Sequence, residues 1–151
     1  MTSEQIELVQ RAWGKVTALN NTYVQEVYAE LFRLSPELIN LFPDPAGMPV
    51  AKVSDTLNTV ITSLEQLDAL SFIIRDLGRR HQKFKVQSHQ FALLKQALTL
   101  VLARRLGEHF TPALSDAWSQ MYDEIATLML EGLSQPTESV PQPSRPRNTA
   151  A

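Results

Sequence analysis

The residue whose type and position point most directly to chemistry is His81. Leu70, Ile74, Leu77 and Phe84 recur at helical spacing, and His81 falls on the same stripe, four residues after Leu77 and three before Phe84. A basic ring is therefore expected to face an apolar interior, where either a hydrogen bond or a metal must satisfy it. On spacing alone, a hydrogen-bonded core histidine is the simpler interpretation, so a metal-binding role needs support from the rest of the chain.

The other two histidines do not complete a catalytic or zinc site with His81. His109 lies in a predicted loop between helices, and His89 lies just beyond the helix that carries His81. The chain has no HExxH motif and no nucleophilic serine motif. It has no cysteine, which excludes disulfides, thiolate-ligated zinc and iron–sulfur clusters. A single inward histidine among helices instead suits axial ligation of a flat, apolar cofactor.

We expect the elements that position His81 to be helices throughout. Apolar residues recur at helical spacing along the chain, and no segment shows the alternation of apolar and polar residues that is typical of a strand. Caps, prolines and glycines set the expected boundaries. We expect helices to begin after Thr2 (a capping box with Gln5), near Asn21, at Pro36 with Ser35 as its cap, at Val50, near Leu70, after Ser88 as a cap, and at Pro112 after Thr111. The first should stop near Asn20, the third at Phe42 and the sixth at Gly107. Residues 43–49 are too rich in proline and glycine for a helix.

Composition narrows the class of protein. A chain of 151 residues predicts one domain, and a formal net charge of -2 gives no bias toward nucleic acid or an anionic membrane. The N-terminus lacks the features of a signal peptide, and no apolar run is long enough to span a bilayer. These features predict a soluble cytoplasmic protein.

The composition changes at Ser134. Residues 134–151 hold four prolines among serine, threonine and glutamine, with almost nothing apolar to bury. We therefore expect a folded domain over 1–133 and a disordered, proline-rich tail over 134–151. The alternative is a docking segment, because Pro143 to Pro146 forms a PxxP pattern.

Several motifs together resemble the globin family, particularly bacterial single-domain and neuroglobin-like globins. They occur in the family's order, and the similarity runs from about Ser3 to Leu133. The motifs are Trp13-Gly14-Lys15-Val16, Leu31-Phe32 to Pro36 and Phe42, Leu77-Gly78-Arg79-Arg80-His81, Phe110-Thr111-Pro112, and Ala117-Trp118-Ser119-Gln120-Met121-Tyr122. The resemblance implies a globin fold of about seven helices around haem b, with a shortened loop between the third helix and the distal helix.

The resemblance also implies roles for individual residues. His81 matches the proximal ligand of the haem iron, and Tyr28 matches a distal position from which its phenol could donate a hydrogen bond to dioxygen. The implied haem pocket comprises Phe42, Met48, Pro49, Val53, Leu57, Leu77, Val86 and Phe91. Candidates for the haem propionates are Lys52, Arg80, Lys85 and His89. Each role has a plainer rival, which is a core apolar side chain, a solvated basic face, or a tyrosine whose hydroxyl reaches the surface.

The distal side departs from the family pattern. Pro49, or Met48 if the loop shifts by one residue, stands where many globins have a distal histidine or glutamine, and neither side chain donates a hydrogen bond. Tyr28 is then the one strong distal donor, and ligation by two histidines is excluded. Met48 or Lys52 could approach the iron instead.

The proximal side departs as well. Phe91 and Leu133 stand where flavohaemoglobin-like proteins hold the imidazole with a tyrosine and a glutamate. The His81 ring would then donate to a backbone carbonyl, which favours ligand binding over peroxidase-like chemistry.

Three functions follow from this resemblance. The first is reversible binding of dioxygen, nitric oxide or another diatomic ligand for supply, storage or sensing. The second is a nitric oxide dioxygenase served by a separate reductase, because no reductase domain follows in the chain. The third is a haem-free helical sensor or scaffold. We expect a monomer or weak homodimer, with binding as the first choice.

Overall fold

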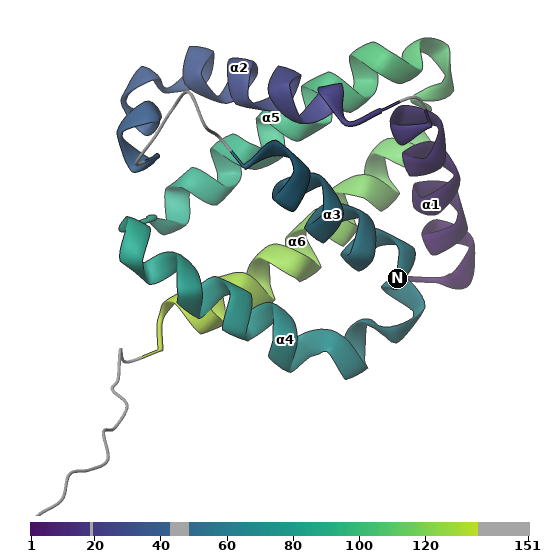
Figure 1. The fold of residues 1–151 in the computed structure, drawn as a ribbon. Helices are drawn as coiled ribbons and strands as arrows, with labels where there is room; N and C mark the ends of the chain where they lie inside the picture. Colours follow the sequence, from purple (N-terminus) through teal and green to yellow (C-terminus); the bar gives the residue numbers. More distant parts are fainter. Residues whose placement is uncertain (19, 43–48, 136–151) are drawn as a thin grey trace, which may run out of the picture.

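The computed structural model describes residues 1–18, 20–42 and 49–135. Over these ranges every secondary-structure element is a helix, as predicted (Figure 1). Six α-helices and one longer 3-10 helix, η1, make up the seven main helices. They are α1 (Ser3–Thr17), α2 (Thr22–Leu34), η1 (Pro36–Leu41), α3 (Val50–Thr62), α4 (Leu67–Arg80), α5 (Ser88–Leu106) and α6 (Pro112–Leu133). Short 3-10 turns η3 (Leu64–Gln66), η4 (His81–Phe84) and η5 (Gly107–His109) connect them. None of the helices in these ranges is both long and apolar enough to cross a membrane.

Local signals place several helix ends correctly. Thr2 and Gln5 form the expected capping box, with hydrogen bonds of 2.9 and 3.1 Å between side chain and backbone. Thr111 accepts from the backbone N–H of Leu114 at 3.2 Å, and Pro112 occupies the first position of α6. Gly107 ends α5 with a φ of 57°, a left-handed value that favours glycine.

One expected cap is confirmed in position only, and another is wrong. Ser35 is the N-cap residue of η1 and Pro36 begins this helix, but the Ser35 hydroxyl donates to the Glu37 carboxylate and makes no capping bond to the backbone. The N-cap of α5 is Gln87, which shares a capping box with Gln90, and Ser88 is the first helical residue.

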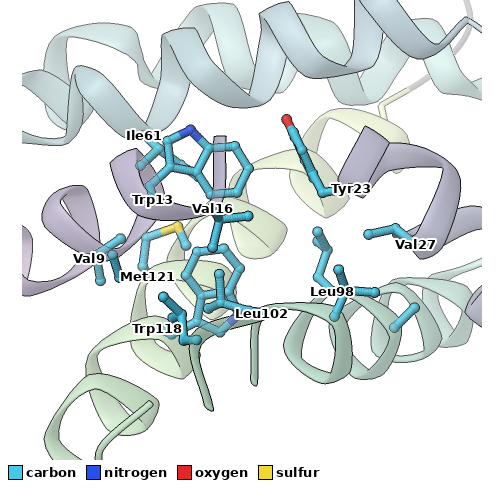
Figure 2. Close-up of a cluster of buried hydrophobic side chains, with 14 of the residues drawn as sticks. Val9, Trp13, Val16, Tyr23, Val27, Ile61, Leu98, Leu102, Trp118 and Met121 are labelled. Atoms are coloured by element: carbon cyan, nitrogen blue, oxygen red, sulfur yellow. The ribbon is translucent and has the colours of Figure 1, made fainter. Parts of the chain in front are cut away.

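The core is built on two tryptophans at the crossing of the first and last helices. Trp13 and Trp118 stack with ring centroids 6.0 Å apart, and Tyr23 meets Trp13 edge to face at 5.1 Å. All three are at most 2% exposed, and Figure 2 shows them with Val16, Leu102 and Met121 in one cluster. Each such side chain contributes roughly 1.5–3 kcal/mol by leaving water, so this cluster anchors the fold.

Three hydrogen bonds hold α3 against this core. The Trp13 Nε1–H donates to the Asn58 Oδ1 at 3.2 Å, and the Tyr23 and Ser54 hydroxyls lie 3.0 Å apart. Gln10 donates to the backbone carbonyl of Ile61 at 3.0 Å. In Figure 2 the Trp13 nitrogen and the Tyr23 oxygen point out of the cluster on the same side. Through these bonds the α1 and α2 helices fix the helix that carries Val53 and Leu57.

The helix that leads to His81 ends earlier than the apolar stripe predicts. α4 ends at Arg80, and His81 is its C-cap residue and the first residue of η4. The His81 N–H still bonds to the Gly78 and Arg79 carbonyls, so the chain tightens into a 3-10 turn instead of unwinding. Met48, the shortened loop and the tail after Gln135 lie outside the described residues.

Candidate functional site

His81 has a defined ring orientation. Its Nδ1 lies 2.7 Å from the backbone carbonyl oxygen of Leu77, one turn earlier in α4. Because a carbonyl oxygen can only accept, Nδ1 carries the proton, and in the neutral ring Nε2 keeps its lone pair. The Phe84 ring meets the imidazole edge to face at 6.1 Å and limits its rotation. The ring is half-buried and presents one nitrogen capable of binding a metal.

Three aromatic rings come together where η1 follows α2. Tyr28 contacts the Phe42 ring edge to face at 5.2 Å and stacks with Phe32 at 6.1 Å. Phe32 and Phe42 are also edge to face, at 5.6 Å. The Tyr28 side chain is 8% exposed, which contradicts the simple picture of a surface tyrosine. The three rings lock the direction of the Tyr28 phenol.

Burial raises the pKa of Tyr28 above its ordinary value, because the phenolate would lose hydration. The phenol therefore stays protonated at neutral pH and can act as a hydrogen-bond donor. Within the described ranges no residue hydrogen-bonds its hydroxyl. Tyr28 is thus a nearly buried donor that these residues do not engage.

Apolar side chains of the expected pocket are left partly exposed. Phe42, Val53 and Leu57 pack on the edge of the main core, and each is only half-buried. Leu77 and Val86, which flank His81 in the chain, have the same intermediate exposure. Partly exposed apolar surface of this kind fits a flat apolar ligand that covers it. The described residues show no direct contact between Phe42, Val53 or Leu57 and the His81 ring.

The remaining pocket candidates lie at the edges of this region or in the core. Pro49 is exposed and is the N-cap residue of α3, where its carbonyl accepts from Val53 N at 3.0 Å. Phe91 is buried, and its backbone carbonyl accepts from the Tyr122 hydroxyl at 2.6 Å. That hydrogen bond ties α5 to α6, so a packing role accounts for the position of Phe91.

The four basic candidates are all exposed. Arg80 pairs with Asp76 at 3.1 Å, and Asp76 also bonds to Arg79, whose hydrogen bond is the main cause that lowers the pKa of that carboxyl. Lys85 has a φ of 58° and ends the η4 turn. Lys52 lies in the first turn of α3, and His89 is the second residue of α5. Arg80 therefore already has a partner, whereas the structure adds no contact for the Lys52 ammonium among the described residues.

Sequence reasoning missed several residues that position the site. Asn58 and Ser54 hold α3, and Gln82 bonds to the end of α6 through the backbone carbonyl of Leu133 at 2.9 Å. Nothing in the local pattern distinguishes these polar residues from solvated ones, because their partners are distant in sequence. The described part of the chain holds no group of three or more histidine, aspartate or glutamate side chains able to bind a metal ion.

Seven helices in this order, with one histidine at the end of the helix before α5, define a globin-type protein. The family model described as Globin matches residues 25–129, and the chain belongs to this family. It is 28% identical over 146 residues to a neuroglobin of Tetraodon nigroviridis, covering 87% of this chain and 92% of the relative. Neuroglobin-1 of Oncorhynchus mykiss (27%) and a neuroglobin of Chaenocephalus aceratus (26%) are similar over the same shares.

Proposed function

We propose that this globin binds haem b through His81 and reversibly binds a diatomic ligand, dioxygen or nitric oxide, for supply, storage or sensing. The observation that carries the proposal is the 2.7 Å hydrogen bond between His81 Nδ1 and the Leu77 carbonyl. It selects the ring tautomer whose Nε2 lone pair can ligate iron. Membership of the globin family supports haem as the cofactor.

Haem, when bound, would supply the iron to which the diatomic ligand binds, with His81 holding that iron. The partner of His81 then favours binding over oxygen activation. A neutral carbonyl polarises the imidazole less than a carboxylate would, so the ring donates less electron density. The Leu77 carbonyl therefore supports a reversible binder better than an oxygen-activating enzyme.

Tyr28 supports the same function on the ligand side. Its phenol is protonated at neutral pH and oriented by Phe32 and Phe42. A hydrogen bond from such a donor to a polarised ligand is worth roughly 1.5–3 kcal/mol. Phe42, Val53 and Leu57 contribute an apolar wall that keeps water away from the same region.

The test is an absorption spectrum of the purified protein after haem addition, in the ferric and ferrous states, with and without oxygen. We expect an intense Soret band and a five-coordinate ferrous form that converts to a stable oxygen complex. His81→Ala should lose this spectrum, whereas His109→Ala, a matched change at an exposed histidine in η5, should keep it.

Two outcomes would contradict the proposal. Unchanged haem binding by His81→Ala would refute the axial assignment, and no haem uptake by the wild type would favour a haem-free sensor or scaffold. Sustained conversion of nitric oxide to nitrate, with oxygen and an added electron donor, would instead favour the nitric oxide dioxygenase.

A further inference from the structure

The helix that carries His81 has a single main support. Apart from the turns on either side of it in the chain, α6 is the element against which α4 packs extensively in the described ranges. The α4 helix also exposes two large apolar side chains, Phe72 to 68% and Ile73 to 48%. In Figure 1 the last turns of α6 meet α4 toward its C-terminal end. The position of α4 in the molecule is therefore set by α6.

Two glycines let the helix backbones touch at this crossing. A Cβ built on Gly78 would lie 2.8 Å from the Met129 Cα and nearer still to its carbonyl oxygen. A Cβ built on Gly132 would lie 2.6 Å from the Arg75 carbonyl carbon. Real side chains do not tolerate such contacts with backbone atoms, so any larger residue must separate the helices.

A side chain next to His81 closes the same interface. The Gln82 amide donates to the Leu133 carbonyl at 2.9 Å and also to the Gln135 carbonyl. The last carbonyls of a helix have no partner within it, so Gln82 satisfies groups that α6 leaves open. The Arg75–Glu131 ion pair, 2.7 Å, lies at the edge of the crossing. These contacts flank His81, with Gly78 three residues before it and Gln82 directly after it.

We infer that the end of α6 positions His81, with Gly78, Gly132 and Gln82 as the positioning residues. The inference rests on the proposed function, because it concerns how His81 is presented to a haem. The end of α4 would otherwise fray, as helix ends do. The two glycines set the distance between α4 and α6. Gln82 holds η4, the turn that follows α4, against the end of α6.

The first experiment compares Gln82→Ala with Gln96→Ala, a matched change at an exposed glutamine of α5. In the haem-free protein we measure amide hydrogen exchange of His81 and Lys85, whose N–H groups bond within this turn. Gln82→Ala should speed their exchange roughly five- to tenfold, as expected for the loss of a hydrogen bond. Gln96→Ala should leave it unchanged.

The second measurement uses the haem-loaded protein. Gln82→Ala should shift the iron–histidine stretching band in resonance Raman spectra and speed haem release roughly tenfold, the scale found when outer partners of a ligand are removed. Gly132→Ala should produce the same shift. Gly14→Ala is the control, because no atom lies within 4 Å of a Cβ at that position and alanine is the better helix former.

The outcomes separate the two proposals. Unchanged exchange in Gln82→Ala, or an unchanged iron–histidine band in both variants, overturns the positioning role even if the wild type binds haem. If the wild type takes up no haem, the proposed function fails, and the exchange of His81 and Lys85 still decides whether Gln82 holds this turn. If Gly132→Ala does not fold, the results for Gln82→Ala alone decide whether the positioning role holds.

Discussion

Tyr28 combines burial, a fixed ring and a hydroxyl that the described residues leave without a hydrogen bond. Its phenol stays protonated at neutral pH and can donate a hydrogen bond to a partner outside the described residues. The proposed function supplies such a partner, a diatomic ligand on the side of the pocket opposite His81. Under that function, we expect Tyr28 to act more directly on ligand affinity than the other pocket side chains.

We predict that Tyr28→Phe speeds dioxygen dissociation from the haem-loaded protein about tenfold, which corresponds to the loss of about 1.4 kcal/mol of hydrogen bonding. Stopped-flow displacement of oxygen measures this rate. Tyr23→Phe is the control: it removes a hydroxyl that bonds to Ser54 and should lower stability without changing dissociation. Equal rates for Tyr28→Phe and the wild type would remove the phenol from ligand binding.

At the scale of the elements, α3 depends on side-chain hydrogen bonds as well as on apolar packing. It buries one residue completely, Ile61, while Val53 and Leu57 remain half-buried. Two hydrogen bonds, Trp13 to Asn58 and Tyr23 to Ser54, therefore contribute substantially to holding α3 against α1 and α2. The loss of either bond should therefore lower the free energy of unfolding.

We predict that Asn58→Ala lowers the free energy of unfolding by about 1–2 kcal/mol, because it leaves the nearly buried Trp13 N–H without its partner. Urea unfolding followed by tryptophan fluorescence measures the change. Thr59→Ala, one residue away on an exposed part of α3, should cost less than about 0.5 kcal/mol. Similar losses in both variants would show that the Trp13–Asn58 bond contributes nothing specific.

The sequence predicts correctly those interactions whose two partners lie close together in the chain. The Thr2–Gln5 and Thr111–Leu114 caps lie within one helical turn, and both were predicted correctly. Ser35 occupies the expected cap position but bonds to Glu37 instead of the backbone, and Gln87 replaces Ser88 as the cap of α5, because nearby polar side chains offer short bonds that composition alone does not rank.

The long-range contacts of the site were beyond such reasoning. Gln82 and Leu133 are separated by 51 residues, and the Trp13–Asn58 bond spans 45. Helical periodicity predicted that the helix continues through His81, whereas α4 ends at Arg80, and the glycine crossing with α6 belongs to tertiary packing that periodicity does not describe. The apolar pattern thus predicts the helices, whereas the pairing of α4 with α6 decides where the histidine lies.

At the scale of the whole molecule, the three tyrosines link stability to pH. Burial is the main cause that raises the pKa of Tyr23, Tyr28 and Tyr122 above the ordinary value of 10.0. In the unfolded chain these phenols ionise near that pH, whereas the folded protein keeps them protonated. The folded state then binds more protons above about pH 10, so the free energy of unfolding must fall as the pH rises.

We predict that stability changes little from these groups below about pH 9 and then falls by up to about 1.4 kcal/mol per pH unit for each tyrosine. Urea unfolding at several pH values from about 8 to 11 measures the slope. Tyr122→Phe should be less stable at pH 8, because it loses the 2.6 Å hydrogen bond to the Phe91 carbonyl, yet show a shallower decline above pH 10. Both proteins contain the same lysines, so the difference in slope isolates the phenol. Parallel curves would mean that Tyr122 ionises as readily in the folded protein as in the unfolded chain. That result would contradict the prediction that burial raises the pKa of Tyr122.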